Sequence, residues 1–236
     1  ESTTAAYGMG TLQIGRTTIV GGIRAERNTW DSTRYQVDAR TLSVSSREAG
    51  RDYTQFLPGL HLRHTLQKNL ILRESYNRSY ARPSLGRLTL GRSEDINGNI
   101  AVGNPLLDPT TSHNADVQIE KYTEKGGLYS AGFFWKKMKG FYYNADLRFT
   151  DVDVNGDPIV DPLGTRRYRK QENAEGATNY GVELIVQQKM HFLPPILRSL
   201  TANLSATFGK SEAKYGALRR GEKLPRGNPL AGLRVA

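Results

Sequence analysis

The sequence predicts an all-β fold: a segment of an antiparallel transmembrane β-barrel with about eight strands. Several stretches alternate apolar and polar residues, and tight turns alternate with long polar connections. No apolar run approaches the roughly 20 residues of a membrane helix. Hydrophobic residues make up only 37% of the chain, which a barrel tolerates because every second residue of its strands faces away from lipid.

Alternation is clearest over residues 200–208, where Leu, Ala and Phe alternate with Thr, Asn and Ser. Such a strand has one face in an apolar medium and the other in water. Seven more stretches follow this pattern less regularly: 5–14, 19–26, 56–63, 70–77, 116–120, 129–136 and 180–188. A tilted membrane strand needs about 9–11 residues, so we expect eight strands of roughly that length.

The connections between these strands differ in length in a regular way. Short turns are expected at 15–17, 67–69, 124–127 and 191–199. Long polar segments separate the resulting hairpins: 31–52, 81–113, 144–179 and 210 onward. Outer-membrane barrels have short turns on the periplasmic side and long loops outside, so this order favours such a barrel.

Aromatic residues lie near both expected membrane interfaces. Tyr122 and Tyr129 flank one short turn, where the inner interface is expected, and Phe56, Tyr76, Tyr180 and Phe208 lie toward the long loops. Glu74 falls on the expected lipid face. A carboxylate is least costly there near an interface, so we expect Glu74 either near the outer headgroups or at a local bulge.

Four segments resemble motifs of the TonB-dependent outer-membrane receptors, in the order in which that family has them. The first is the hairpin from Tyr7-Gly8-Met9-Gly10 to Gly21-Gly22-Ile23-Arg24-Ala25-Glu26, and the second is the strand exit from Leu72-Arg73 to Ala81-Arg82-Pro83. The third is the loop Gly103-Asn104-Pro105-Leu106-Leu107-Asp108-Pro109-Thr110-Thr111-Ser112, and the fourth is Tyr180-Gly181-Val182-Glu183-Leu184 followed by Phe192-Leu193-Pro194. Each motif is weak alone, but together they cover most of the chain.

The resemblance implies an interior part of a plugged barrel of about 22 strands. Residues 1–236 would all belong to the barrel domain, without the plug domain or the final strands. It further implies a receptor in the bacterial outer membrane that imports a scarce nutrient such as a siderophore, vitamin or glycan. Energy would come from the TonB complex, which acts through the plug, and no enzymatic step is required.

Contacts to the transported ligand are expected in the external loops, at Trp30, Tyr35, Arg166, Arg167 and Tyr168. The basic run that continues to Lys170 could bind an anionic ligand or lipopolysaccharide phosphates, because arginine binds such oxygens with two hydrogen bonds. The alternative is that this run is simply solvated.

Asp151, Asp153, Asn155 and Asp157, with Gly156 among them, match the first half of a calcium-binding loop. The twelfth position of that loop is Pro162 where calcium loops have glutamate, so an Asn-Gly turn is the competing interpretation. No cofactor is otherwise expected. The chain has no cysteine, and no serine, histidine and carboxylate set indicates catalysis.

Two other classes of protein remain open at this point. The chain could form a small closed eight-stranded barrel with a structural or adhesive role. The net charge of +10 also suits a soluble β-protein that binds polyanions. Its basic residues are scattered, however, so nucleic acid is not an expected partner.

Overall fold

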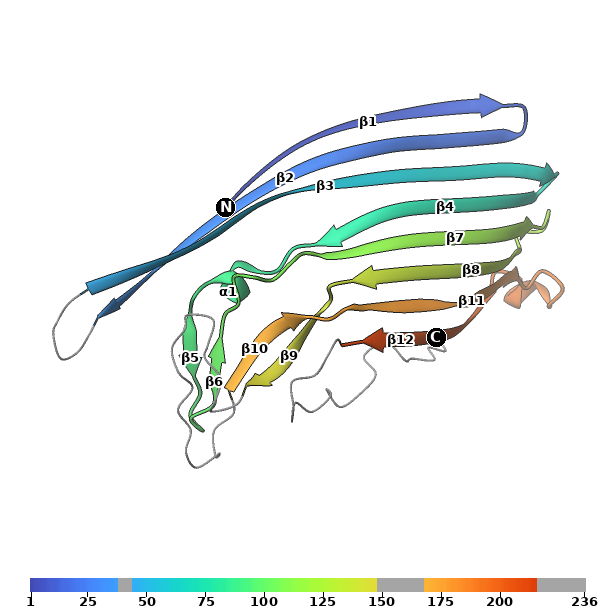
Figure 1. Ribbon diagram of the computed structural model, residues 1–236. Coiled ribbons are helices and arrows are strands. Elements are labelled where there is room, and N and C mark those ends of the chain that lie inside the picture. The colour runs from blue at the N-terminus through green and yellow to red at the C-terminus, as the bar shows by residue number, and fades with distance from the viewer. Residues whose placement is uncertain (38–43, 148–167, 216–236) are drawn as a thin grey trace.

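In the computed structural model the chain forms one large and one small β-sheet (Figure 1). The structure describes residues 1–37, 44–147 and 168–215. The eight strands of the large sheet have the order β1-β2-β3-β4-β7-β8-β11-β12, and every neighbouring pair is antiparallel. They are β1 (Ser2–Ile14), β2 (Thr17–Val37), β3 (Val44–Gln67), β4 (Leu70–Ala81), β7 (Thr110–Tyr122), β8 (Leu128–Lys139), β11 (Gly176–Lys189) and β12 (Thr201–Lys214).

All eight expected strands and all four expected turns are confirmed. The β1–β2 and β3–β4 turns have only two residues between the strands. Each places one residue in the left-handed region: Gly15 at φ 56° and Asn69 at φ 66°, the two residue types that adopt this conformation most readily. The β11–β12 turn contains the short 3-10 helix η1 (Pro195–Leu197).

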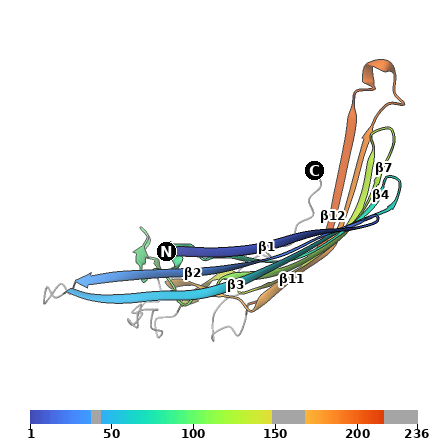
Figure 2. The same cartoon turned by 90° about the horizontal axis from the view of Figure 1, so that it is seen from above.

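The strand register places the apolar faces of all eight strands on the same side of the sheet. One row of paired residues runs from Leu12 through Ile19 and Leu62 to Val117, Phe133, Val182 and Phe208. Most of these side chains are exposed to solvent in the isolated chain. A face this apolar requires lipid or protein to cover it, so we call it the lipid face and the opposite side the lumen face. The strands bend together along their length (Figure 2).

One of the two alternatives for Glu74 and the placement of Tyr122 are wrong. Glu74 pairs with Leu62 and Val117 in an uninterrupted register, so there is no bulge at this position, and a place near the outer headgroups stays the prediction. The irregularity in this part of the sheet lies between Thr65 and Gln67. Tyr122 lies on the lumen face, where its hydroxyl donates to Glu120 Oε2 at 2.9 Å, and it does not contribute to the inner aromatic belt.

The segment 31–52 is not the long loop that the sequence suggested. β2 and β3 continue as paired strands up to Val37 and Val44, and they extend well past the ends of β1 and β4 (Figure 1). This part of the hairpin is surrounded by water, so its strands do not need one apolar face. Its paired residues are mostly polar, such as Thr33 with Glu48 and Gln36 with Ser45.

The segments 81–113 and 144–179 also contain more structure than expected. They hold a helical turn, α1 (Leu85–Leu88), and the small sheet with the strand order β5-β6-β10-β9. Its strands are β5 (Arg92–Glu94), β6 (Ile100–Val102), β9 (Tyr142–Leu147) and β10 (Tyr168–Asn173). β6 and β10 pair in parallel, so two external segments far apart in sequence form one sheet.

β9 and β10 continue the β8–β11 hairpin beyond a bend at Gly140. The pairing of β8 with β11 ends at Met138 and Ala177 and resumes between β9 and β10 at Tyr142 and Asn173. Gly140 has φ 71°, a backbone conformation that costs glycine little. Beyond the bend, the outer half of the hairpin leaves the large sheet and forms two strands of the small sheet.

Among the described residues, most buried apolar side chains lie outside the membrane-spanning part of the large sheet. They include Trp30, Leu88, Leu90, Ile100, Val102 and Leu107. The large sheet has β1 and β12 as its two edges and does not close on itself. The interpretation as a small closed barrel is therefore wrong. In the part of the chain that the structure describes, no helix is long and apolar enough to cross a membrane.

Candidate ligand-binding site

The lumen face of the large sheet is a polar wall. A groove of about 410 Å³ on it is lined by polar side chains of β2, β3, β4 and β7, among them His61, Arg63, Arg73, Asp116 and Gln118. Beside it, Arg73 Nε lies 3.1 Å from Glu120 Oε2. Glu120 is only 8% exposed, and a buried carboxylate needs such a partner. The wall can therefore contact a polar plug or solute.

Nearer the external loops, Arg82 connects the end of β4 to β1 and β2. Its Nη1 donates to Thr3 Oγ1 at 2.8 Å and to Asn28 Oδ1 at 3.0 Å. Asn28 Nδ2 donates to the Tyr80 hydroxyl at 3.0 Å, and this hydroxyl donates to Glu26. The strand-exit motif 81–83 thus supplies the arginine that fixes where β4 leaves the barrel wall.

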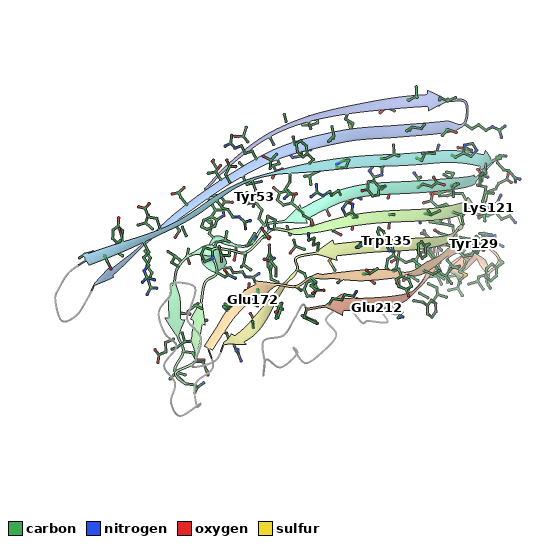
Figure 3. The ribbon with its side chains drawn as sticks, viewed as in Figure 1. Tyr53, Lys121, Tyr129, Trp135, Glu172 and Glu212 are labelled. Atoms are coloured by element: carbon green, nitrogen blue, oxygen red, sulfur yellow. The ribbon has the colours of Figure 1, made fainter. Side chains whose placement is uncertain are left out.

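Three external segments meet in a hydrophobic cluster beyond the large sheet. Trp30 of the extended hairpin packs with Leu88 of α1 and with Leu107 of the following loop. Ala49, Tyr53 and Tyr142 pack around these three side chains, and Figure 3 shows Tyr53 on the extended part of β3. Burial of side chains this large stabilises the arrangement. We call the cluster, together with the polar contacts described next, the loop junction.

The polar contacts of the loop junction centre on Asp108 and Asn173. Arg51 Nη2 lies 2.7 Å from Asp108 Oδ1. The Asn173 side chain accepts from Asp108 N at 2.8 Å and donates to Asp108 O at 2.9 Å and to Gly140 O at 2.6 Å. Asn104 Nδ2 donates to Gln171 O at 2.8 Å. The motif 103–109 therefore binds both neighbouring loops.

A second groove, of about 430 Å³, lies between α1 and the small sheet. Three cationic side chains line it, Arg87, Arg169 and Lys170, together with several glycines. A Cβ at one of these, Gly103, would lie 1.9 Å from the carbonyl oxygen of Thr89, so only glycine fits where these backbones cross. We call this the basic groove. Guanidinium and ammonium groups around a hollow of this size suit an anionic ligand.

Two of these cations, Lys170 and Arg87, contact neighbouring side chains. Lys170 Nζ lies 2.6 Å from Glu172 Oε1, and Arg87 lies over the ring of Tyr142, 5.9 Å from its centroid. Burial raises the pKa of Tyr142 above its usual value and that of Tyr53 to about 12. Both phenols are therefore neutral at physiological pH and add no negative charge near the groove.

The expected ligand contacts lie in different environments. Trp30 is 4% exposed and belongs to the loop junction, so its described contacts are with protein. Tyr35 is 70% exposed near the tip of the extended hairpin. Tyr168 begins β10, where its backbone pairs with Ile100 and Leu147, and the next two residues line the basic groove.

Arg166 and Arg167 lie outside the described residues, as do the expected calcium ligands Asp151, Asp153, Asn155 and Asp157. Among the residues that are described, no group of three or more His, Asp or Glu side chains could hold a metal ion.

Arg87 and the crossing at Gly103 were not expected from the sequence. Arg87 occupies a polar segment without periodicity, and its neighbours Arg169 and Lys170 follow some 80 residues later. Only the pairing of β6 with β10 brings them together. Lys170 did belong to the basic run noted in the sequence, and that run was the one signal that pointed to this place.

Comparison with known proteins agrees with this architecture. The family described as "TonB dependent receptor-like, beta-barrel" matches residues 1–234. No curated protein sequence matches the chain significantly.

Similar solved structures are the copper transporter OprC (TM-score 0.60, 14% identity), the hemophore receptor HasR of Serratia marcescens (0.57, 14%) and the siderophore receptor PirA of Pseudomonas aeruginosa (0.55, 17%). The matches cover 89%, 88% and 90% of this chain but only 29%, 34% and 43% of those proteins. The chain thus spans less than half of their length.

The eight-stranded sheet corresponds to part of such a barrel, and the family is one of non-enzymatic outer-membrane transporters whose members interact with TonB. The chain belongs to the TonB-dependent receptor β-barrel family.

Proposed function

We propose that this chain supplies the ligand-receiving wall and loops of an active importer for an anionic nutrient, with a ferric siderophore as the leading substrate class. The basic groove supports this most directly, because three cations and close backbone surround it between two interlocked external loops. Vitamins and glycans are the other substrate classes. A neutral glycan would gain less binding free energy from these positive charges.

Structural relatives support the class of substrate in a general way. They are a siderophore receptor, a hemophore receptor in complex with its hemophore and heme, and a copper transporter. At 14–17% identity, the likeness is one of fold, so the assignment of an anionic chelate to this chain depends on the basic groove.

Capture would begin at the external loops. Tyr35, Arg166, Arg167 and Tyr168 remain proposed contacts, to which we add Arg87 and Lys170. Trp30 would contribute to binding indirectly, because it stabilises the loop junction that positions these contacts. Beyond the basic groove, the polar lumen wall at Arg63 and Arg73 would face the plug. As in the family, TonB acting on the plug would then open the path inward.

The test is uptake of radioactive iron by cells in which the receptor, expressed from its complete reading frame, is the only route. The probes are ferric citrate, a ferric catecholate and a neutral ferric hydroxamate. Arg87→Ala with Lys170→Ala should raise the half-saturating concentration of the anionic chelate at least about tenfold, because a charge-assisted contact contributes on the order of 1.5–3 kcal/mol and about 1.4 kcal/mol corresponds to a factor of ten. The hydroxamate should be affected less.

Lys68→Ala is the matched control. It removes one positive charge at the opposite end of the large sheet, where Lys68 pairs with Glu124 at 3.1 Å in exposed turns. Equal uptake of all three chelates by the double variant and the control would refute the anionic-substrate proposal.

A further inference from the structure

The lipid face changes character abruptly at the loop end of β7, β8, β11 and β12. Trp135 and Tyr180 are paired and form its last aromatic row here; Figure 3 shows Trp135 well to the left of Tyr129, which lies at the turn end of the same strand. The next row on the same face consists of His113, Lys137, Thr178 and Glu212. The row after that contains Thr111, Lys139 and Lys214.

This order of rows places the lysines at the depth of lipid headgroups. Residues two apart on a strand are separated by about 6.6 Å, and a tilt of about 45° reduces this to roughly 5 Å along the membrane normal. Lys137 and Lys139 therefore lie about 5 and 10 Å beyond an aromatic row that belongs at the interface. The polar region of each leaflet is about 5–8 Å thick, and a lysine side chain reaches several ångströms within it.

The cations surround a groove of about 540 Å³, the largest described on this part of the sheet. Its lining includes His113, Lys137, Lys139, Lys214, Glu175 and Glu212. The three lysines are exposed. The groove therefore opens toward the membrane headgroups and not toward the lumen.

Two contacts fix the border of this groove. His113 Nδ1 lies 2.8 Å from the Tyr76 hydroxyl, and the two rings stack with centroids 6.1 Å apart. At the other side, Lys210 Nζ lies 2.7 Å from Glu212 Oε1, so Glu212 is already neutralised. Lys137, Lys139 and Lys214 then remain opposed mainly by Glu175, which leaves the groove positive.

The lipid face of β2 and β3 shows a different arrangement. There the Arg27 guanidinium is paired with the Asp52 carboxylate, to which Nε donates at 3.0 Å. The gathering of three lysines around one groove belongs to the loop end of β8 and β12.

We propose that this groove binds the phosphate groups of an outer-leaflet glycolipid, with bis-phosphorylated lipid A as the ligand. The inference rests on the outer-membrane placement of the barrel and is independent of which nutrient is imported. Lysine ammonium groups at headgroup depth attract anionic lipid, and they form strong charge-assisted hydrogen bonds with phosphate oxygens. The aromatic row directly below would contact the first part of the acyl chains.

The test uses the receptor expressed from its complete reading frame, purified in neutral detergent, and fluorescent bis-phosphorylated lipid A. Lys137→Glu with Lys139→Glu should weaken binding at least about tenfold, because two attractive charges become repulsive. Lys136→Glu is the control, since Lys136 is the chain neighbour of Lys137, is also exposed and belongs to the lumen face. It should bind lipid A like the parent protein.

Two competitors identify the ligand. Unlabelled bis-phosphorylated lipid A should displace the probe, whereas dephosphorylated lipid A and inorganic phosphate should not. Equal loss in the Lys136 variant, or displacement by inorganic phosphate alone, would overturn the proposal. Heat-modifiable migration on gels shows that each variant is folded. Uptake of the ferric chelates should be unchanged in the double variant, which separates this inference from the proposed transport function.

Discussion

The large sheet and the loop junction are stabilised in different ways. In the sheet, long ladders of backbone hydrogen bonds connect strands whose side chains face lipid on one side and polar surroundings on the other. The loop junction instead buries Trp30, Leu88 and Leu107 and joins its loops through Asp108 and Asn173. The medium around the sheet therefore determines its sequence pattern, whereas specific contacts between distant residues determine the loop junction.

Removal of the Trp30 side chain should break the loop junction and leave the sheet intact. Trp30→Ala creates a cavity beside Leu88 and Leu107, which should lower the free energy of local opening by about 3–5 kcal/mol. Hydrogen exchange should show faster exchange of the amides in 85–109 and unchanged protection in β7 and β8. Tyr35→Ala, a 70% exposed aromatic of the same hairpin, is the control. Faster exchange throughout the sheet would contradict this separation.

A charge introduced on the lipid face should affect the sheet and not the loops. Leu204 pairs with Val186 on the lipid face, and its neighbour Asn203 pairs with Gln187 on the lumen face. Leu204→Arg should destabilise the barrel by about 2–4 kcal/mol near the midplane, measured by urea unfolding in lipid vesicles. Asn203→Arg should destabilise the barrel by less than about 1 kcal/mol. Equal costs would show that the two faces have been assigned wrongly.

The smallest effect is expected at Glu74, the carboxylate within the lipid face. Glu74→Leu should stabilise the barrel by about 1 kcal/mol, since acidic residues cost less in lipid than basic ones. The same change at Glu120, the partner of Arg73 on the lumen face, should destabilise it because it leaves an arginine without its carboxylate. Urea unfolding of both variants measures the difference, and a stabilised Glu120 variant would be incompatible with this account.

The sequence was informative wherever the surrounding medium imposes a period of two. For that reason the residues of the lipid face could be predicted, and with them the turns that separate the strands of the large sheet. The expectation that Tyr122 belongs to the inner aromatic belt is wrong because nearness to a turn does not determine which face of the strand a residue is on. The alternation of the strand determines it. Tyr122 follows Ile119 by three residues, which puts the two on opposite faces of a strand.

The external half of the molecule was harder to predict. The extended part of β2 and β3 lies in water, so no apolar period marked it. β5 and β6 have only three residues each, too few for a pattern. Arg87 and Lys170 in the basic groove, like Trp30 and Leu107 in the loop junction, are some 80 residues apart and meet only in the folded chain.

The unequal lengths of the strands have a consequence for how the cell surface is organised. β2 has 21 residues and β3 has 24, whereas about ten suffice to cross the bilayer. At about 3.3 Å per residue and a tilt of about 45°, the remainder of this hairpin rises on the order of 25 Å above the leaflet. A large particle that approaches the cell would meet this stiff two-stranded ribbon first. Surface labelling or proteolysis of intact cells should therefore begin there.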